Sequence, residues 1–420
     1  MATTTATVAP GKILNRAGQE LPRAKYDFAV IGGGLLGIVC AWFLREFADA
    51  GKIVLLIEAS GIPSEEGATH VAPALHHHFY NHPEELARAG WLSHFLENQN
   101  TATPLFSRVG FLRQHRADDP PPRPFAAWRA EQSANVRHNL AALDAGFAED
   151  TSVVFDPAGG YAHAEALALH LGRAAVTRGV DLLLNARAAF DDGDPTTLRL
   201  DRLEMNNRMQ VEIVRRETVH AATVIVACGA SGARFIADQL GASPPAGFGR
   251  SYVQYLRFEN DADLRRDARG VLAMPVVATA RGGFALRPHG DGALLVPVAP
   301  PLAPDPADYA PAGGRLQGVP TGLRQELLNR LVAALDAVPA LGRASLNLGQ
   351  TATQLRGAWE ALTPSGRPEF RQMPDTAVWL LAGGGEHGFS LGVAKACELA
   401  HQLSATTAAP LPWQTTSLSS

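Results

Sequence analysis

The chain is poor in the residues that mark several protein classes. Its 420 residues include only three cysteines, Cys40, Cys228 and Cys397, which lack metal-ligand spacing and lie in apolar segments. No apolar run approaches the roughly 20 residues of a membrane span, and the first 25 residues lack the apolar core of a signal peptide. A net charge of −4 indicates no basic surface for nucleic acid. We therefore expect a cytoplasmic protein without a membrane span, a metal site or a nucleic-acid partner.

The most informative pattern lies near the N-terminus. Residues 28–37 read Phe-Ala-Val-Ile-Gly-Gly-Gly-Leu-Leu-Gly, in which an apolar strand enters a glycine turn. A helix is expected over residues 38–47, and a second apolar strand over residues 53–57 ends at Glu58, 21 residues after Gly37. This order of strand, glycine turn, helix, strand and acid is typical of the dinucleotide-binding βαβ unit.

Each residue type in this motif has a physical reason. Gly32 allows the tight turn, Gly34 lets the backbone approach a pyrophosphate, and Gly37 lets the helix and the strand pack closely. The N-terminus of the helix presents N–H groups and a positive dipole end to phosphates. Glu58 can accept hydrogen bonds from both hydroxyls of an adenosine ribose.

The ends of the chain look like parallel α/β structure, and the middle looks richer in antiparallel strands. After residue 150 the pattern predicts helices over residues 164–178, 323–338 and about 390–403. It predicts strands over residues 180–184, 212–219, 223–227, 252–258, 283–287, 293–298 and 378–382, with a turn at residues 289–292. Gly383-Gly384-Gly385 follows the last strand.

Several segments beyond the first motif resemble, in the same order, the D-amino-acid oxidase-like flavoproteins, the family of glycine oxidase, sarcosine oxidase and dimethylglycine dehydrogenase. The segments are GATHVAPAL at residues 67–75, DPAGGY at 156–161, VIVACGAS at 224–231, TPSGRP at 363–368 and LAGGGEHGFSLG at 381–392. The resemblance covers residues from about 27 to 400. It implies FAD as the cofactor and oxidation of an amine or amino acid by hydride transfer to the flavin, giving an imine that hydrolyses.

The resemblance also implies an α/β fold in which a discontinuous Rossmann-like FAD-binding domain carries a second, antiparallel-sheet substrate domain. We predict an arm at residues 1–24 and a tail at 411–420. The FAD-binding domain would comprise residues 25–95, 152–235 and 346–410, and the substrate domain residues 96–151 and 236–345.

The expected FAD contacts fall in four segments. They are Gly32, Gly34, Leu35, Leu36, Gly37, Glu58, Ala59 and Ser60; Gly67, Ala68, Thr69, His70, Ala72, Ala74 and Leu75; Ala188, Cys228 and Gly229; and Gly383, Gly385, Glu386, His387, Gly388, Phe389 and Ser390. The three adjacent glycines let backbone pass close to a flavin ring, and the helix after them can aim its positive end at the ring.

Two departures from the family pattern bear on the chemistry. The family's amino-acid oxidases carry an arginine for the substrate carboxylate shortly before the Thr-Pro, whereas this chain has Glu360 before Thr363-Pro364. Glu360, a candidate catalytic residue, suggests a cationic or uncharged amine. Arg287, Arg356, Trp359 and Tyr252 are the candidate substrate-binding residues.

The second departure concerns flavin attachment. Dimethylglycine dehydrogenase links FAD to a histidine that follows a tryptophan, and the ungapped match puts His70 at the tryptophan and Val71 at the histidine. We expect non-covalent FAD, while a one-residue shift would still allow attachment.

The family's sarcosine-type oxidases use a lysine to help oxygen react, and this chain has none between Lys52 and Lys395. This absence favours a dehydrogenase that passes electrons to an acceptor other than oxygen, or an oxidase that uses Arg or His in place of the lysine.

The most conspicuous polar cluster is His76-His77-His78. Consecutive side chains point in different directions, so the three cannot ligate one metal. One of His77 and His78 could face the substrate and accept the amine proton near neutral pH.

Three other interpretations remain. Residues 67–95 resemble the flavin domain of tRNA wobble-uridine modification enzymes, although the negative net charge argues against tRNA. Loss of the family arginine also fits a low-turnover flavoprotein that acts with a partner protein. A simple NAD-dependent dehydrogenase leaves the C-terminal glycines unexplained.

Overall fold

A computed structural model describes most of the chain. The described residues are 9–49, 51–64, 67–99, 104–116, 126–127, 134–143, 151–191, 193–241, 245–258, 264–279, 284–289, 292–297, 325–326, 328–330, 332–333, 354–404 and 410–415. The chain forms two compact units. The first unit comprises Met1–His70, Ala164–Arg250 and Trp359–Ser417, and the second comprises Val71–His163, Ser251–Ala358 and Leu418–Ser420.

The bounds of these units differ from the predicted domain bounds. The prediction placed residues 71–95 and 152–163 in the FAD-binding domain, whereas they belong to the second unit. The predicted N-terminal arm, residues 1–24, and residues 236–250 belong to the first unit. None of the helices in the described ranges is long and apolar enough to cross a membrane.

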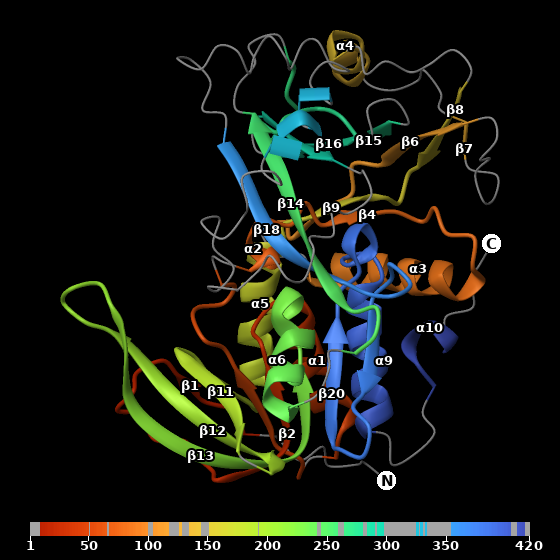
Figure 1. Ribbon diagram of the computed structural model, residues 1–420. Coiled ribbons are helices and arrows are strands. Elements are labelled where there is room, and N and C mark those ends of the chain that lie inside the picture. Colours follow the sequence, from red (N-terminus) through yellow and green to blue (C-terminus); the bar gives the residue numbers. More distant parts are fainter. Residues whose placement is uncertain are drawn as a thin grey trace. The chain divides into compact units, whose positions relative to one another are not determined.

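The first unit is built on a largely parallel sheet (Figure 1). Its strands are β1 (Ile13–Leu14), β2 (Lys25–Ile31), β3 (Val54–Ile57), β10 (Val180–Leu183), β11 (Ala186–Asp191), β12 (Asp194–Met205), β13 (Val211–Val226), β19 (Glu369–Gln372) and β20 (Val378–Ala382). Its helices are α1 (Leu35–Phe47), α2 (Ala68–Val71), α5 (Ala164–Thr177), α6 (Gly232–Leu240), α9 (Gly392–Ser404) and α10 (Pro412–Thr415).

The parallel strands follow the order β1-β10-β3-β2-β13-β20. β2 and β3 are joined through α1, and β13 and β20 lie on the other side of β2. The order therefore reverses at β2, which is the kind of switch point where open α/β sheets bind ligands. β1, from the predicted arm, is part of the sheet and pairs with β10.

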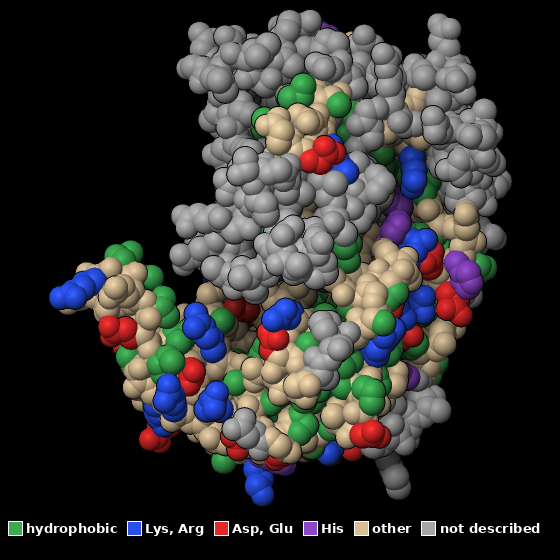
Figure 2. Space-filling view, in the orientation of Figure 1, with side chains coloured by type: hydrophobic (Ala, Val, Ile, Leu, Met, Phe, Trp, Pro, Cys, Tyr) green, Lys and Arg blue, Asp and Glu red, His purple; other side chains and the backbone are tan. Residues whose placement is uncertain are grey.

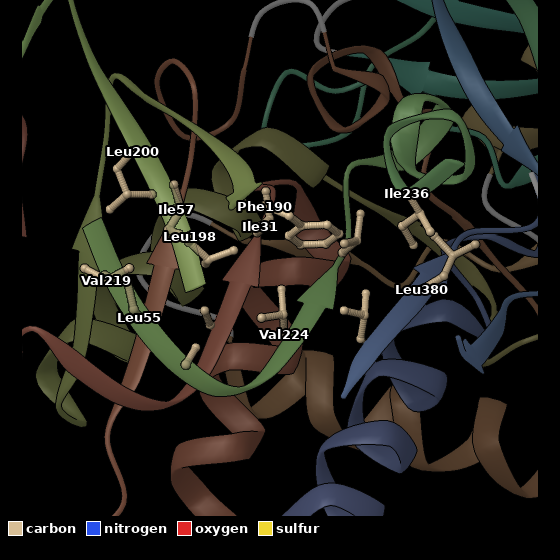
Figure 3. Close-up of a cluster of buried hydrophobic side chains, with 14 of the residues drawn as sticks. Ile31, Leu55, Ile57, Phe190, Leu198, Leu200, Val219, Val224, Ile236 and Leu380 are labelled. Atoms are coloured by element: carbon tan, nitrogen blue, oxygen red, sulfur yellow. The ribbon is translucent and has the colours of Figure 1, made fainter. Parts of the chain in front are cut away.

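Apolar residues on one face of these strands form the core of the first unit (Figure 3). Leu55 and Ile57 of β3 are fully buried, as are Val224 of β13 and Leu380 of β20. On the other side of the sheet, α1 packs against α5 and α9. The continuous apolar runs read from the sequence are typical of strands buried on both faces.

One sequence prediction was wrong. The pattern predicts two strands, at residues 212–219 and 223–227, but Val211–Val226 is a single strand, β13. Its first part pairs antiparallel with β12, and its last part pairs parallel with β2. One backbone can do both because a strand has two hydrogen-bonding edges. The β12–β13 hairpin ends in exposed Met205 and Met209, and Figure 2 shows charged and hydrophobic side chains on it.

The second unit contains two sheets. The eight-stranded sheet of the described residues has the order β18-β14-β17-β16-β15-β6-β8-β7, and a smaller sheet has the order β4-β9-β5. Their strands are β4 (Leu75–His76), β5 (Phe106–Ser107), β6 (Phe111–Arg116), β7 (Ala126–Ala127), β8 (Thr151–Asp156), β9 (Gly160–Ala162), β14 (Gly249–Phe258), β15 (Val276–Thr279), β16 (Phe284–His289), β17 (Gly292–Pro297) and β18 (Gln354–Leu362). The helices are α3 (Pro83–Gln99) and α4 (Ala134–Leu143).

Pairing in the larger sheet is mostly antiparallel, as the middle of the sequence predicts. β16 and β17 form the predicted hairpin, although residues 290 and 291 of its turn lie outside the described residues. Most of the helix predicted over residues 323–338 also lies outside them.

The start of α1 is fitted tightly against the glycine turn. A Cβ atom at Gly37 would lie 2.0 Å from the carbonyl oxygen of Gly32. Gly32 itself has φ +112°, and a Cβ there would lie 2.5 Å from the carbonyl oxygen of Ala227. Glycine at these two positions is therefore required by the fold, before any ligand is considered.

We expect Gly37→Ala to destabilise the first unit by about 2 kcal/mol or more, because α1 would have to move away from the turn. The matched control is Gly51→Ala, since a Cβ at Gly51 meets nothing within 4 Å. Denaturant unfolding of both variants measures the difference. Equal free energies of unfolding would contradict the packing described.

Candidate cofactor site and a buried polar cluster

Four parallel strands of the first unit end side by side. Ile31, the last residue of β2, pairs with Ile57 at the end of β3 and with Val226 at the end of β13. Val226 in turn pairs with Leu380 of β20. The segments that follow, which include the glycine turn, Glu58 and the Gly383 corner, therefore leave the sheet at one edge. Ligands of open α/β sheets bind at this edge.

Glu58 is tied to the glycine turn. Its Oε2 accepts a 2.6 Å hydrogen bond from the Gly33 N–H, and its Oε1 accepts a 3.0 Å bond from the Ser60 N–H. A Cβ at Gly33 would lie 2.9 Å from the Cβ of Glu58. Gly33 is not among the predicted cofactor contacts, because the spacing alone does not reveal this role. Oε1 also accepts the Ser60 hydroxyl at 3.3 Å, whereas Oε2 keeps a second lone pair with which Glu58 can still accept a ribose hydroxyl.

Thr69 caps the start of α1. Its Oγ1 accepts a 3.0 Å hydrogen bond from the N–H of Leu35, which is the first residue of the helix. Helix N-termini leave N–H groups outside the intrahelical ladder, and these groups bind phosphates. The structure thus brings Leu35 and Thr69, two of the predicted cofactor residues, into contact.

Gly34 differs from the glycines around it. Its backbone has φ −70° and ψ 171°, which any residue can adopt. The nearest atom to an added Cβ is the Thr69 Oγ1, at an ordinary contact distance of 3.4 Å. The fold therefore does not demand glycine at position 34, whereas the close approach of a pyrophosphate would demand it. The residues at this edge fit FAD in this respect.

The C-terminal glycine corner lies against the first motif. A Cβ at Gly383 would meet the Cδ1 of Leu36 at 3.5 Å, and a Cβ at Gly392 would meet its Cδ2 at 2.9 Å. Gly384 is pressed against the backbone of Arg367, where a Cβ would lie 2.3 Å from the carbonyl carbon. Gly385 has φ +45° and opens the 3₁₀ turn Gly385–His387. Leu36 of α1 thus joins the opening and closing motifs of the chain.

Cys228 lies just beyond β13 and donates a hydrogen bond to the Ile31 carbonyl at 3.3 Å. Burial, together with the nearby Glu58 charge, raises the pKa of its thiol to about 12. The thiol therefore stays protonated at neutral pH and is a packing residue rather than a nucleophile.

The other predicted cofactor residues lie in both units. Ala59, Gly67, Ala68, His70, Ala188, Gly229, His387, Gly388, Phe389 and Ser390 are in the first unit. Ala72, Ala74 and Leu75 are in the second unit. His70 Nδ1 lies 3.5 Å from the Glu165 carboxylate. The side chain of Glu386 lies outside the described residues.

The predicted substrate residues are also divided between the units. Trp359 is buried in the first unit beneath the guanidinium of Arg250, 4.7 Å from its ring centroid, and Glu360 beside it is half-buried. Tyr252 and Arg287 are buried in the second unit. A Cβ at Gly357 would lie 2.5 Å from the Tyr252 hydroxyl. The side chain of Arg356 is outside the described residues.

The histidine triplet is buried in the second unit, and the rings of His76 and His78 share one partner. His76 Nε2 lies 2.8 Å from the Ser93 Oγ, and His78 Nε2 lies 3.1 Å from the same oxygen. The other ring nitrogen of His78, Nδ1, lies 2.8 Å from Asp156 Oδ2. A chain of hydrogen bonds therefore runs Asp156–His78–Ser93–His76. Ser93 lacked any signal in the sequence, because it comes from the distant helix α3.

This arrangement argues against the predicted role of His78 as a base for the substrate. Both of its ring nitrogens are engaged, by a carboxylate and by a hydroxyl. His77 Nδ1 accepts the Phe79 N–H at 3.2 Å, so the neutral ring carries its proton on Nε2. Accepting a proton at Nδ1 would break that bond.

Burial sets the charges in the cluster. Desolvation, followed by the neighbouring His78, lowers the pKa of His76 to about 3. Desolvation acts to raise the pKa of Asp156, but hydrogen bonds from His78 and from the Ala158 N–H outweigh it, and the pKa is lowered. At neutral pH the cluster holds a neutral His76 and an ionised Asp156.

The fold and this edge of the sheet define a class: a dinucleotide-binding α/β protein with an added antiparallel unit. The model of the DAO family of FAD-dependent oxidoreductases matches residues 27–402, and the chain belongs to that family. It is an enzyme of the flavoprotein class, as its sequence motifs predict. The predicted fold class is likewise confirmed.

Solved structures share the fold at low sequence identity. Glycine oxidase from Geobacillus kaustophilus has a TM-score of 0.60 and 19% identity, over 93% of this chain and 98% of that one. Iminodiacetate oxidase from a Chelativorans species has a TM-score of 0.61 and 18% identity, over 92% and 97%. L-amino acid deaminase from Proteus vulgaris has a TM-score of 0.62 and 14% identity, over 93% and 96%. No curated protein matches the sequence.

The lowered pKa of buried His76 predicts how the stability of the fold depends on pH. The His76 pKa falls from about 6.5 in the unfolded chain to about 3 in the folded chain, so the unfolded chain binds one more proton between these values. Stability should therefore fall as the pH drops through this window, by up to about 1.4 kcal/mol per pH unit for this group. Asp156, with its lowered pKa, adds a further loss at the acid end.

His76→Gln should flatten this dependence, and exposed His82→Gln is the control. Denaturant unfolding of each variant at several pH values between 3 and 7 measures the slopes. A His76 variant with the slope of the unmodified protein would show that His76 does not titrate as described.

Proposed function

We propose that the chain is an FAD-dependent enzyme that oxidises the C–N bond of a small amine or amino acid. The observation that carries the proposal is the shared edge of β2, β3, β13 and β20, where Glu58, the glycine turn and the Gly383 corner follow strands that end side by side. Both halves of the family's cofactor motif come from distant parts of the sequence and meet in one unit.

Each element at this edge has a role toward FAD. The N-terminus of α1 supports the pyrophosphate, Gly34 leaves room for it, and Glu58 accepts the ribose hydroxyls. The Gly383–Gly385 backbone lies against Leu36 and can pass close to a flavin ring. Bound there, FAD would supply the hydride acceptor for oxidation at the carbon beside the nitrogen, giving an imine that hydrolyses.

The residues also support non-covalent binding. In the ungapped match the attachment position falls on Val71, which has no nucleophilic atom. His70, its neighbour, directs Nδ1 toward Glu165 at 3.5 Å. The His70 ring is therefore oriented by a protein group, the Glu165 carboxylate of α5.

The hydrogen bonds of His77 and His78 favour catalysis without a dedicated base. His78 is engaged at both nitrogens, and His77 uses Nδ1 to accept a backbone N–H. The substrate amine would then have to reach the flavin in its neutral form, and the rate should follow the pKa of that amine.

Gly34→Ala tests the cofactor site, because it separates ligand binding from folding. We expect the free energy of unfolding of the apoprotein to change by less than about 0.5 kcal/mol, since the backbone and the neighbours accept a Cβ. We expect FAD affinity to fall at least ten-fold, measured by fluorescence titration of the apoprotein. Gly51→Ala should change neither quantity.

The reaction is tested by anaerobic mixing of the yellow holoprotein with amines and amino acids, followed by flavin absorbance. Bleaching by at least one small amine or amino acid supports the proposal. A colourless protein that does not bind added FAD would refute the proposal. A holoprotein whose flavin is reduced by none of the amines and amino acids would refute it as well.

A further inference from the structure

The far end of the β12–β13 hairpin carries a cluster of exposed apolar side chains. Nine large hydrophobic side chains of the described residues are strongly exposed, and five of them lie between residues 205 and 214. Single exposed hydrophobic residues are normal on a protein surface, whereas a cluster of them marks an interaction site. The hairpin extends away from the rest of the sheet (Figure 1), and hydrophobic side chains lie on it (Figure 2). The hairpin patch, with exposed fractions between 44% and 77%, consists of Met205, Met209, Val211, Ile213 and Val214.

The chain itself covers one face of the hairpin. Arg202 and Glu204 of β12 point to this face, because side chains alternate along a strand. Residues 16–19 lie against it: Arg202 donates hydrogen bonds to two of their carbonyl groups, and Glu204 accepts one of their N–H groups. This face of the hairpin is therefore part of the first unit and not open to a partner.

The opposite face carries the hairpin patch. Met205 points to it, since Met205 follows Glu204 in an alternating strand. Residues directly opposite each other in a sheet share a face, so Val211, the partner of Met205, lies there as well. Ile213, two residues further along β13, joins them. Their exposure shows that no segment within the described ranges covers this face.

A strand from another molecule does not fit the edge of β13. The register between β12 and β13 shifts beyond the pair Arg202–Arg215, so that Val214 has no partner residue in β12. Such a bulge, followed by the charged side chains of Arg215, Arg216 and Glu217, is a feature that keeps edge strands from pairing with other strands. The hairpin patch is therefore a surface for packing face to face.

The charges of the hairpin fit a second copy of the chain better than a strongly charged partner. Residues 204–217 carry three acidic and three basic side chains, so their net charge is zero. An anionic membrane or a nucleic acid would need an excess of basic residues. A neutral surface with an apolar centre does not repel its own copy.

Two copies packed antiparallel also bring opposite charges together. Asp201 lies on the face of the hairpin patch, about 10 Å from the level of Glu204 toward the base of the hairpin. Arg208 lies in the turn, about 10 Å from that level in the other direction. A two-fold axis at this level therefore places Arg208 of one copy over Asp201 of the other. Asp201 contacts one guanidinium, that of Arg216 at 3.2 Å, and a carboxylate can accept a second.

We propose that the hairpin patch is the contact between two copies of this chain, packed face to face and antiparallel about a two-fold axis. Five apolar side chains from each copy leave water in the contact, and an Arg208–Asp201 pair lies at each end. A contact confined to one hairpin is smaller than a standard protein interface. The dimer therefore exchanges rapidly with monomers, with a Kd on the order of 10 μM.

Sedimentation velocity of the 420-residue protein at about 0.5 to 200 μM, on both sides of this Kd, measures the association. Ile213→Arg and Met205→Arg should each raise the Kd at least about 20-fold, because each places a charge in the apolar centre twice. Leu169→Arg is the matched control and should leave the Kd unchanged, since Leu169 is exposed on α5 of the same unit, by 40% against 44% for Ile213. Circular dichroism confirms that each variant is folded.

Cross-linking tests the orientation. The reagent is a bis-maleimide that spans about 10 Å, the separation of two packed sheets. The double variant Asp201→Cys, Arg208→Cys should give a covalent dimer. Neither single variant should do so, because an antiparallel arrangement keeps the two copies of one position about 20 Å apart. The unmodified protein, with its three native cysteines, is the control for the reagent.

A protein that stays monomeric up to about 200 μM would overturn the proposal. A dimer that both Ile213→Arg and Met205→Arg leave intact would do the same, because its contact would lie elsewhere. Single cysteine variants that cross-link as well as the double variant would overturn the antiparallel packing. A monomer that sediments with phosphatidylglycerol vesicles, and loses this binding in Ile213→Arg, would assign the hairpin patch to a membrane instead.

Discussion

The contact between α1 and the glycine turn is the constraint on which the first unit depends. Gly37 lies so close to the Gly32 carbonyl that a single methyl group would overlap it, with only 2.0 Å between the atoms. This closeness sets the angle at which α1 leaves the sheet. It also places the N-terminus of α1 at the edge where β2, β3 and β13 end. A polar ligand with phosphates is the natural occupant of such an edge.

The glycines of this edge have separate physical roles. Gly32, Gly33 and Gly37 are required by neighbouring protein atoms, whereas Gly34 has room for a Cβ. Only a glycine such as Gly34 points to a ligand, because no protein atom prevents a side chain at that position. A glycine motif therefore becomes stronger evidence once the contacts of each member are known.

The second unit shows how differently buried polar groups can be treated. The histidine cluster is satisfied internally, through Ser93 and Asp156, so its members stabilise the unit and hold fixed protonation states. Arg287 is buried to a similar degree but lacks a counter-ion among the described residues. In sequence, the histidine triplet was the more conspicuous feature. In the structure, however, the histidines are paired with one another's neighbours inside the protein, and Arg287 is a buried polar group that lacks a counter-ion among the described residues.

The sequence by itself determined the βαβ motif, the family and the cofactor class, because these depend on local spacing of glycines, apolar runs and one acid. It also predicted β2, β3, β10 and β20 of the first unit, since buried parallel strands are continuous apolar runs, but it did not predict β1, β11, β12 or β19. It did not reveal that β13 is one strand that pairs with β12, β2 and β20, or that Ser93 bridges two histidines. Pairing and burial join residues far apart in the chain, so only the tertiary structure decided which polar side chains are paired inside the protein.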